Sequence, residues 1–104
     1  MVRKKDGSMQ MCVNNCALNA QTIRDSYPVT CIQESLVTLS GARFFSICDL
    51  RSGYWQIGLT ADAHEKAASC SRSSLYKWDV MLFGLANVPA TFQGLMDCVL
   101  SGLQ

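Results

Sequence analysis

The stretch FSICDLRSGYWQI, residues 45–57, places a carboxylate among apolar side chains. The alternation predicts a β-strand over residues 44–50, with Asp49 on the same face as Ile47. An ionised carboxylate on such a face is costly unless it is paired or bound to a metal ion. Spacing alone leaves three explanations: a metal ligand, an ion pair with Arg51, or an exposed residue in a turn.

The chain before this stretch predicts a hairpin and a helix. Asp6-Gly7 lies between two extended runs and is a strong two-residue turn signal. Residues 14–28 are polar and predict a loop. Thr30 with Gln33 fits a capping box for a helix that ends before Gly41.

The chain after it predicts two further strands and two helices. Residues 54–59 and 75–82 alternate as strands, residues 60–68 fit a short helix, and residues 71–74 form a turn. Apolar residues then recur at offsets 0, 3, 4, 7, 8 and 11 from Phe92, which predicts an amphipathic helix over 89–103. Pro89 suits its first turn, whereas Gly94 is a poor interior residue. The fold class predicted is α+β.

Composition excludes several classes of protein. The 104 residues suffice for one small domain, 49% are hydrophobic, and the net charge of +1 gives no overall basic field. The amino end has no apolar core of a signal peptide and no apolar run approaches a membrane span, so we expect an intracellular protein, cytoplasmic or nuclear, without membrane contact. The six cysteines lack paired zinc-ligand spacing, and we expect reduced thiols that act as small hydrophobes.

Other residues carry weaker signals for a binding site. Lys4 and Lys5 beside the turn could grip phosphate or simply be solvated. Tyr54-Trp55 could stack on a base or lie on opposite faces of a strand. Phe83-Gly84 could seat an anion near a helix N-terminus or form an ordinary turn. His64 is expected to be exposed on the short helix.

Together and in order, these segments resemble the reverse transcriptase domain of gypsy-type long-terminal-repeat retrotransposons. VRKKDGS, with MCV and LN, resembles the fingers hairpin, and DLRSGYWQI resembles the palm strand with the first catalytic aspartate. VMLFGLANVPATFQGLMD resembles the segment leading into the second palm helix. The resemblance covers nearly the whole chain and implies a partial fingers and palm of a right-hand polymerase, residues 1–104. The fingers hairpin and connecting helix would occupy 1–43, and the first half of the palm, with an intervening fingers segment, would occupy 44–104.

The resemblance implies RNA-directed DNA polymerisation by a two-metal mechanism. Asp49 would be the catalytic residue and would hold two Mg²⁺ ions, with the backbone carbonyl of Leu50 as a second ligand. The partners would be an RNA or DNA primer–template and deoxynucleoside triphosphates. Nucleotide-binding roles carry over to Lys4, Lys5, Ser52, Gly53, Tyr54, Phe83 and Gly84, and template- or primer-proximal roles to Asn87, Pro89 and Gln93.

Departures from the family pattern limit these expectations. Met9-Gln10 replaces Trp-Arg after the turn, and Gln10 lacks the charge of the arginine that grips the triphosphate in the family. Asn14-Asn15-Cys16 replaces Asp-Tyr-Arg. The family's Tyr-x-Asp-Asp hairpin, with two further carboxylates, would follow Gln104, as would the rest of the polymerase and the ribonuclease H domain. We therefore expect weak or absent Mg²⁺ binding and a chain inactive by itself, with a non-catalytic nucleic-acid-binding remnant as the alternative.

Overall fold

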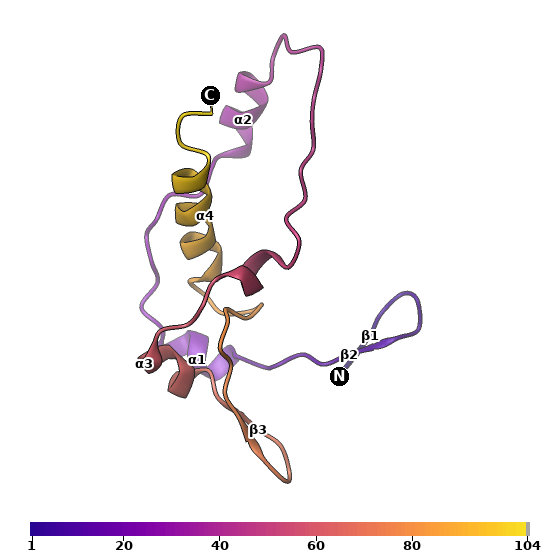
Figure 1. Cartoon of the computed structure of the whole chain (residues 1–104), viewed down its shortest axis with the longest axis vertical. Coiled ribbons are helices and arrows are strands. Elements are labelled where there is room, and N and C mark those ends of the chain that lie inside the picture. The colour runs from indigo at the N-terminus through magenta and orange to yellow at the C-terminus, as the bar shows by residue number, and fades with distance from the viewer. Residues whose placement is uncertain (104) are drawn as a thin grey trace.

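The structure is a computed structural model that describes residues 1–103. Its described part contains two two-stranded antiparallel sheets and four α-helices (Figure 1). This is an α+β arrangement, the fold class that the sequence predicted, with one helix more than expected. It is elongated, with extents of 57 × 35 × 22 Å and a radius of gyration of 17.3 Å. A compact domain of this length has a radius of about 13 Å. No helix among the described residues is long and apolar enough to cross a membrane.

The amino-terminal hairpin is confirmed, but its turn is longer than the two residues predicted, because the Gly7 N–H donates to the Lys4 carbonyl at 3.0 Å. β1 (Val2–Arg3) pairs antiparallel with β2 (Met9–Gln10). The Asp6 carboxylate accepts hydrogen bonds from the backbone N–H and the hydroxyl of Ser8, which lower its pKa. The hairpin projects from the rest of the molecule on an extended segment (Figure 1).

Residues 14–28 are not wholly a loop, because α1 (Cys16–Gln21) forms within them. The Asn14 side chain accepts a hydrogen bond of 3.0 Å from the Cys16 N–H, which satisfies one free donor at the helix start. Ala17, Leu18 and Ala20 are adequate helix formers. The polar composition of the segment concealed this short helix.

The predicted helix after Thr30 forms as α2 (Ile32–Thr38), but its N-cap is Cys31 and no side chain caps it. The expected capping box is therefore wrong. Gly41 lies three residues after the last residue of α2 and has a φ of 86°, the positive value typical of a glycine that follows a helix. All of α2 except Ser35 is exposed.

Residues 44–50 are extended but form no strand, which corrects the prediction. Phe44 is 94% exposed and Ile47 is 96% exposed. A strand needs a neighbour to accept and donate its backbone hydrogen bonds, and no described segment lies in register beside this one. Apolar alternation is a property of the sequence, whereas pairing depends on a partner.

The strand predicted over 54–59 is also wrong. Gly53–Gln56 form a short 3₁₀ helix, η1. Beyond it the chain does pair briefly, since Gly58 bridges Val80 and the Met81 N–H donates to the Ile57 carbonyl at 2.9 Å.

The segment between these parts follows the prediction more closely. α3 (Ala61–Lys66) begins after Thr60, and the turn over 71–74 joins β3 (Ser69–Cys70) to β4 (Leu75–Tyr76). The strand predicted over 75–82 is therefore shorter than expected. His64 is half-buried rather than exposed, because its ring contacts the Leu59 carbonyl at 3.0 Å and the Asp79 carboxylate at 3.5 Å.

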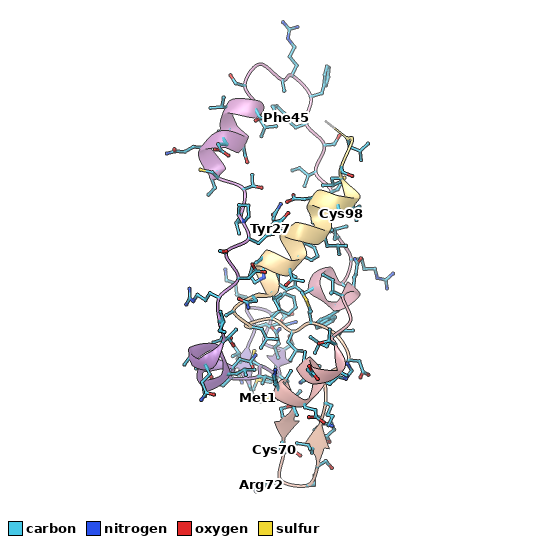
Figure 2. All side chains as sticks on the ribbon, turned by 90° about the vertical axis from the view of Figure 1, so that its left-hand side faces the viewer. Met1, Tyr27, Phe45, Cys70, Arg72 and Cys98 are labelled. Atoms are coloured by element: carbon cyan, nitrogen blue, oxygen red, sulfur yellow. The ribbon has the colours of Figure 1, made fainter. Side chains whose placement is uncertain are left out.

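α4 (Val88–Val99) is the longest helix and confirms the periodic pattern, although it ends before residue 103. Pro89 lies in its first turn. Figure 2 shows Tyr27 beside α4. The Tyr27 ring packs over Gly94, and the Tyr27 hydroxyl donates a 2.7 Å hydrogen bond to Asp97. The side chain of Gln93 donates to the same carboxylate at 2.8 Å. These contacts fasten the chain before α2 to the middle of α4.

The hydrophobic core is small and lies around the N-terminal end of α4. Its buried apolar residues are Ala67, Met81, Leu82, Val88 and Ala90. All six cysteines are free, as expected, but they are exposed and so do not serve as core residues. The proposed division at residue 43 stays a prediction.

Candidate functional site

A hollow of about 370 Å³ opens beside Asp49, and we call it the Asp49 hollow. Two segments supply its wall: residues 48–54, and residues 83–92 from the loop and start of α4. The lining residues are Cys48, Asp49, Leu50, Gly53, Tyr54, Phe83 and Phe92. Five of the sequence-predicted site residues therefore come together here, across a separation of more than thirty positions.

Three aromatic residues, Tyr54, Phe83 and Phe92, line the hollow. The ring of Tyr54 lies 5.2 Å from that of Phe83 and 5.0 Å from that of Phe92, measured between centroids. The ring of Trp55 also contacts that of Phe83, with centroids 6.0 Å apart. Tilted and edge-on contacts of this kind are the favourable geometries for aromatic pairs. Sequence reasoning missed Phe92 as a site residue, since its place in the apolar repeat of α4 indicated only packing.

A tight turn follows Asp49, and its residues Leu50 and Gly53 line the hollow. The Leu50 carbonyl accepts a 3.3 Å hydrogen bond from the Gly53 N–H. Ser52 has φ of 66° and ψ of −8°, the left-handed conformation that L-residues seldom adopt. Strain of this type is concentrated at functional sites. The Gly53 N–H, expected to face a triphosphate, is engaged within the turn.

Asp49 itself is exposed and makes no ion pair with Arg51. The ion-pair explanation of this carboxylate is therefore wrong in this structure. The remaining explanations, an exposed residue beside a turn and a metal ligand, both fit its position at the edge of the hollow.

The residues at the hollow do not fit a two-metal centre. Asp49 is its only carboxylate, and the Leu50 carbonyl is its one further predicted ligand. Within residues 1–103 no group of three His, Cys, Asp or Glu side chains could hold a metal ion. Two divalent cations need more oxygen ligands than one carboxylate and one carbonyl supply.

The remaining predicted residues lie outside the hollow. Lys4 and Lys5 are exposed on the projecting hairpin (Figure 1). Gly84 follows Phe83, and its carbonyl accepts a hydrogen bond from Asn19. Pro89 is exposed at the start of α4, and Gln93 bonds Asp97.

The Asn87 side chain makes hydrogen bonds to the backbone of another segment of the chain. Its Oδ1 accepts from the Asp25 N–H at 2.9 Å and its Nδ2 donates to the Ile23 carbonyl at 2.8 Å. It therefore connects α4 to the segment after α1, and its amide is occupied within the chain.

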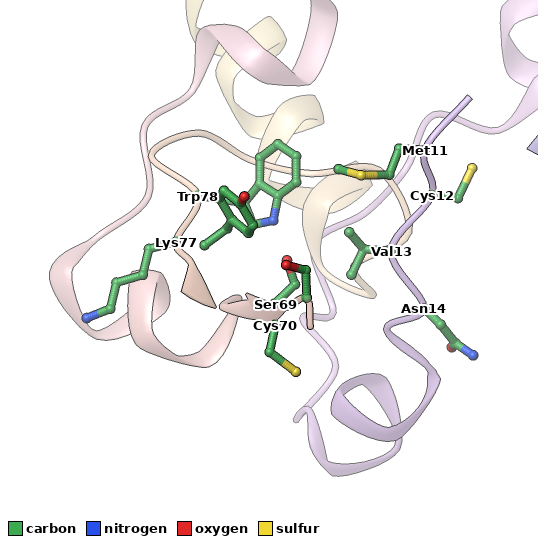
Figure 3. A pocket seen from close by; sticks show the side chains of 10 residues that line it. Met11, Cys12, Val13, Asn14, Ser69, Cys70, Lys77 and Trp78 are labelled. Atoms are coloured by element: carbon green, nitrogen blue, oxygen red, sulfur yellow. The ribbon is translucent and has the colours of Figure 1, made fainter. Parts of the chain in front are cut away.

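A larger cavity, of about 700 Å³, lies elsewhere, between the segment after the first hairpin and the β3–β4 hairpin (Figure 3). Met11, Val13, Ser69 and Trp78 are among its lining residues. It contains none of the predicted site residues. The smaller Asp49 hollow is the better candidate, because it combines a carboxylate, aromatic rings and a strained turn.

Comparison with known proteins agrees with the sequence pattern. The family model for "Reverse transcriptase (RNA-dependent DNA polymerase)" matches residues 2–104. An RNA-directed DNA polymerase homolog of Oenothera berteroana is 38% identical over 93 residues, which cover 89% of this chain and 66% of that protein. Polyprotein P3 of Commelina yellow mottle virus is 34% identical over 102 residues, or 98% of this chain and 5% of the polyprotein.

The enzymatic polyprotein of Figwort mosaic virus (strain DxS) is 35% identical over 99 residues, covering 95% of this chain and 15% of that protein. This chain thus spans less than two thirds of the length of each of these relatives. No solved structure matches it. On the match across residues 2–104, the chain belongs to the reverse transcriptase (RNA-dependent DNA polymerase) family.

Proposed function

We propose that this chain is the nucleotide-binding part of an RNA-directed DNA polymerase, with Asp49 as its first catalytic carboxylate. The observation that supports this most is the Asp49 hollow, which Asp49, Leu50, Tyr54 and Phe83 line together. Residues from two distant segments converge there, and aromatic side chains such as these are the groups on which bases stack.

The chemistry of each residue follows from its position. Tyr54 offers a ring on which the sugar of a nucleotide rests and whose bulk excludes a 2′-hydroxyl. Phe83 lines the same hollow, and Gly84 follows it in the loop. Ser52 and Gly53 contact the triphosphate through backbone N–H groups, which requires the Gly53 N–H to release the Leu50 carbonyl. Lys4 and Lys5 contact the triphosphate only if the hairpin folds over the hollow.

We propose further that this chain alone does not polymerise. Mg²⁺ ions would activate a primer hydroxyl and neutralise the triphosphate in a complete site. A single carboxylate at the hollow does not hold a metal pair. Nucleotide contact is therefore separable from catalysis in this chain.

The source of the chain is a second part of the proposal. The order of VRKKDGS, DLRSGYWQI and VMLFGLANVPATFQ supports a gypsy-type retrotransposon polyprotein. The similar proteins named above are a plant polymerase homolog and plant-virus polyproteins. A phylogeny of the domain that groups the chain with the viral sequences would refute the gypsy-type origin.

Primer extension tests the catalytic proposal. The purified chain is incubated with a primed RNA template, deoxynucleoside triphosphates and Mg²⁺, beside Asp49→Asn. We expect no extension from either protein. Extension that Asp49→Asn abolishes would overturn the proposal of inactivity.

Nucleotide titration tests the binding proposal independently. Addition of a deoxynucleoside triphosphate with Mg²⁺ should shift the NMR signals of Tyr54 and Phe83 and leave those of β3 and β4 unchanged. The Tyr54→Ala variant, which removes the ring, should lose the response. Unchanged Tyr54 and Phe83 signals at millimolar nucleotide would contradict the proposal.

A second candidate function, a non-catalytic nucleic-acid-binding remnant, has its own supporting observation. Lys4 and Lys5 are exposed on the projecting hairpin, and neither makes an ion pair with a described carboxylate. Ammonium groups in such a position attract phosphate, and the attraction weakens with salt. A primer–template gel shift that weakens with salt and disappears in Lys4→Ala/Lys5→Ala would favour this function. Absence of binding at low salt would count against it.

A further inference from the structure

We infer that Asn19 is a positioning residue for the Asp49 hollow: its amide holds the Gly84–Ala86 loop and thereby sets where Phe83 faces Tyr54. This inference rests on the proposed nucleotide-binding role of the hollow. Asn19 lies on α1, 64 positions before Phe83, and does not line the hollow. It therefore acts through the loop.

Both polar atoms of the Asn19 side-chain amide make hydrogen bonds to the loop. Its Nδ2 donates a 2.7 Å hydrogen bond to the Gly84 carbonyl, and its Oδ1 accepts a 2.9 Å hydrogen bond from the Ala86 N–H. An amide is the side-chain group that offers a donor and an acceptor side by side in this way. The two bonds fix the backbone on both sides of Leu85 relative to α1.

The carboxyl-terminal end of the loop, at Asn87, is held by the segment that follows α1. Asn87 bonds the backbone of Ile23 and Asp25, which follow α1. α1 and the segment after it therefore hold the loop at Gly84, Ala86 and Asn87. We call the hydrogen bonds of Asn19 and Asn87 that hold this loop the clamp. Phe83 is the residue immediately before the loop, so its ring takes its position from the clamp.

The position of Phe83 decides the shape of the hollow. Its ring is 5.2 Å from Tyr54 and 6.0 Å from Trp55, between centroids. A shift of the loop would separate Phe83 from Tyr54 without removing any group that lines the hollow. A merely structural tie would instead lower the stability of the whole chain when broken and leave these ring distances unchanged.

The sharpest test is Asn19→Asp. When ionised, the carboxylate still accepts from the Ala86 N–H but faces the Gly84 carbonyl with an oxygen and no proton. When protonated, it again offers a donor and an acceptor. We expect the nuclear Overhauser effect between Tyr54 and Phe83 to be lost at pH 7 and recovered below about pH 3, where an ordinary Asp is mostly protonated, while the wild-type protein shows it at both pH values.

Amide exchange gives an independent reading of the clamp. The Ala86 N–H should exchange about tenfold faster in Asn19→Ala, which removes both bonds. The Asp25 N–H, bonded to Asn87, should keep its rate. Gln21→Ala, an exposed position at the end of the same helix, is the matched control and should leave both rates unchanged.

Nucleotide binding separates this inference from the function on which it rests. If wild-type protein binds a deoxynucleoside triphosphate with Mg²⁺, Asn19→Ala should weaken binding about tenfold. If wild-type protein does not bind, the proposed function fails, and the ring contact and amide exchange still decide the positioning role. An unchanged Tyr54–Phe83 contact in Asn19→Asp at pH 7, or an unchanged Ala86 exchange rate in Asn19→Ala, would overturn the inference.

Discussion

The ring of Tyr54 meets that of Phe92 edge-on, with centroids 5.0 Å apart and an angle of 80° between the planes. The contact joins the short helix after Asp49 to the start of α4. Tyr54 also packs against Phe83, so its ring joins the two segments that line the Asp49 hollow.

Removal of the Tyr54 ring should therefore destabilise the chain. Tyr54→Ala loses two aromatic contacts and should lower the free energy of unfolding by about 2 kcal/mol. Tyr54→Phe keeps both rings in place and should change it by less than about 0.5 kcal/mol. Urea denaturation followed by circular dichroism measures both, and equal losses in the two variants would show that the hydroxyl, not the ring, matters.

The left-handed conformation of Ser52 predicts a gain on substitution. Ser52→Gly relieves an unfavourable backbone conformation and should stabilise the chain by about 0.5 to 1 kcal/mol, after the entropy that glycine adds to the unfolded state. Ser46→Gly is the matched control in the same segment, where φ is not positive. We expect the control to be neutral or destabilising in the same urea titration, and a loss of stability in Ser52→Gly would refute the conformational argument.

The hydrogen bond between Tyr27 and Asp97 predicts a pH dependence. Bonds from Tyr27 and then Gln93 lower the pKa of the Asp97 carboxyl, and the bond to Asp97 raises the pKa of the Tyr27 hydroxyl. A lowered carboxyl pKa contributes stability above the unfolded value of 3.8, and this contribution is lost as pH falls through the folded value. The raised Tyr27 pKa contributes below its unfolded value of 10.0 and is lost as pH rises through the folded value.

Tyr27→Phe tests this relationship in a single titration. The Asp97 carboxyl, followed by NMR, should titrate at a higher pH in the variant than in the wild-type protein. The carboxyl of Asp6, whose pKa is lowered by Ser8, is an internal reference that should not move. An unchanged Asp97 titration would show that the bond does not persist in solution.

Gly94 in the middle of α4 predicts a second stabilising change. A Cβ added there would lie 3.6 Å from the Tyr27 ring, an ordinary contact. Gly94→Ala should therefore gain helix propensity and raise the free energy of unfolding by up to about 1 kcal/mol. Gly41→Ala, at a positive φ, is the contrasting substitution and should lower it. A destabilised Gly94→Ala would mean that Tyr27 packs more closely than this distance indicates.

Local signals predicted the parts of the fold that local chemistry determines. The Asp6-Gly7 turn and the apolar repeat of α4 each specify their element within a few residues. The strand predicted over 44–50 failed because alternation does not provide a pairing partner. The hollow could be anticipated from the resemblance at Asp49 and Phe83, whereas Asn19 could not, because its two partners lie 65 and 67 positions away.

The clamp between α1 and the loop before α4 also has a consequence for synthesis. A chain made from its amino end produces Asn19 long before Gly84 and Ala86, and contacts between such distant residues form late. The first hairpin and α1 therefore leave the ribosome before Gly84 and Ala86, the hydrogen-bond partners of Asn19, have been made. The Asp49 hollow forms only when the last quarter of the chain emerges, after both of its lining segments, residues 48–54 and 83–92, have been translated.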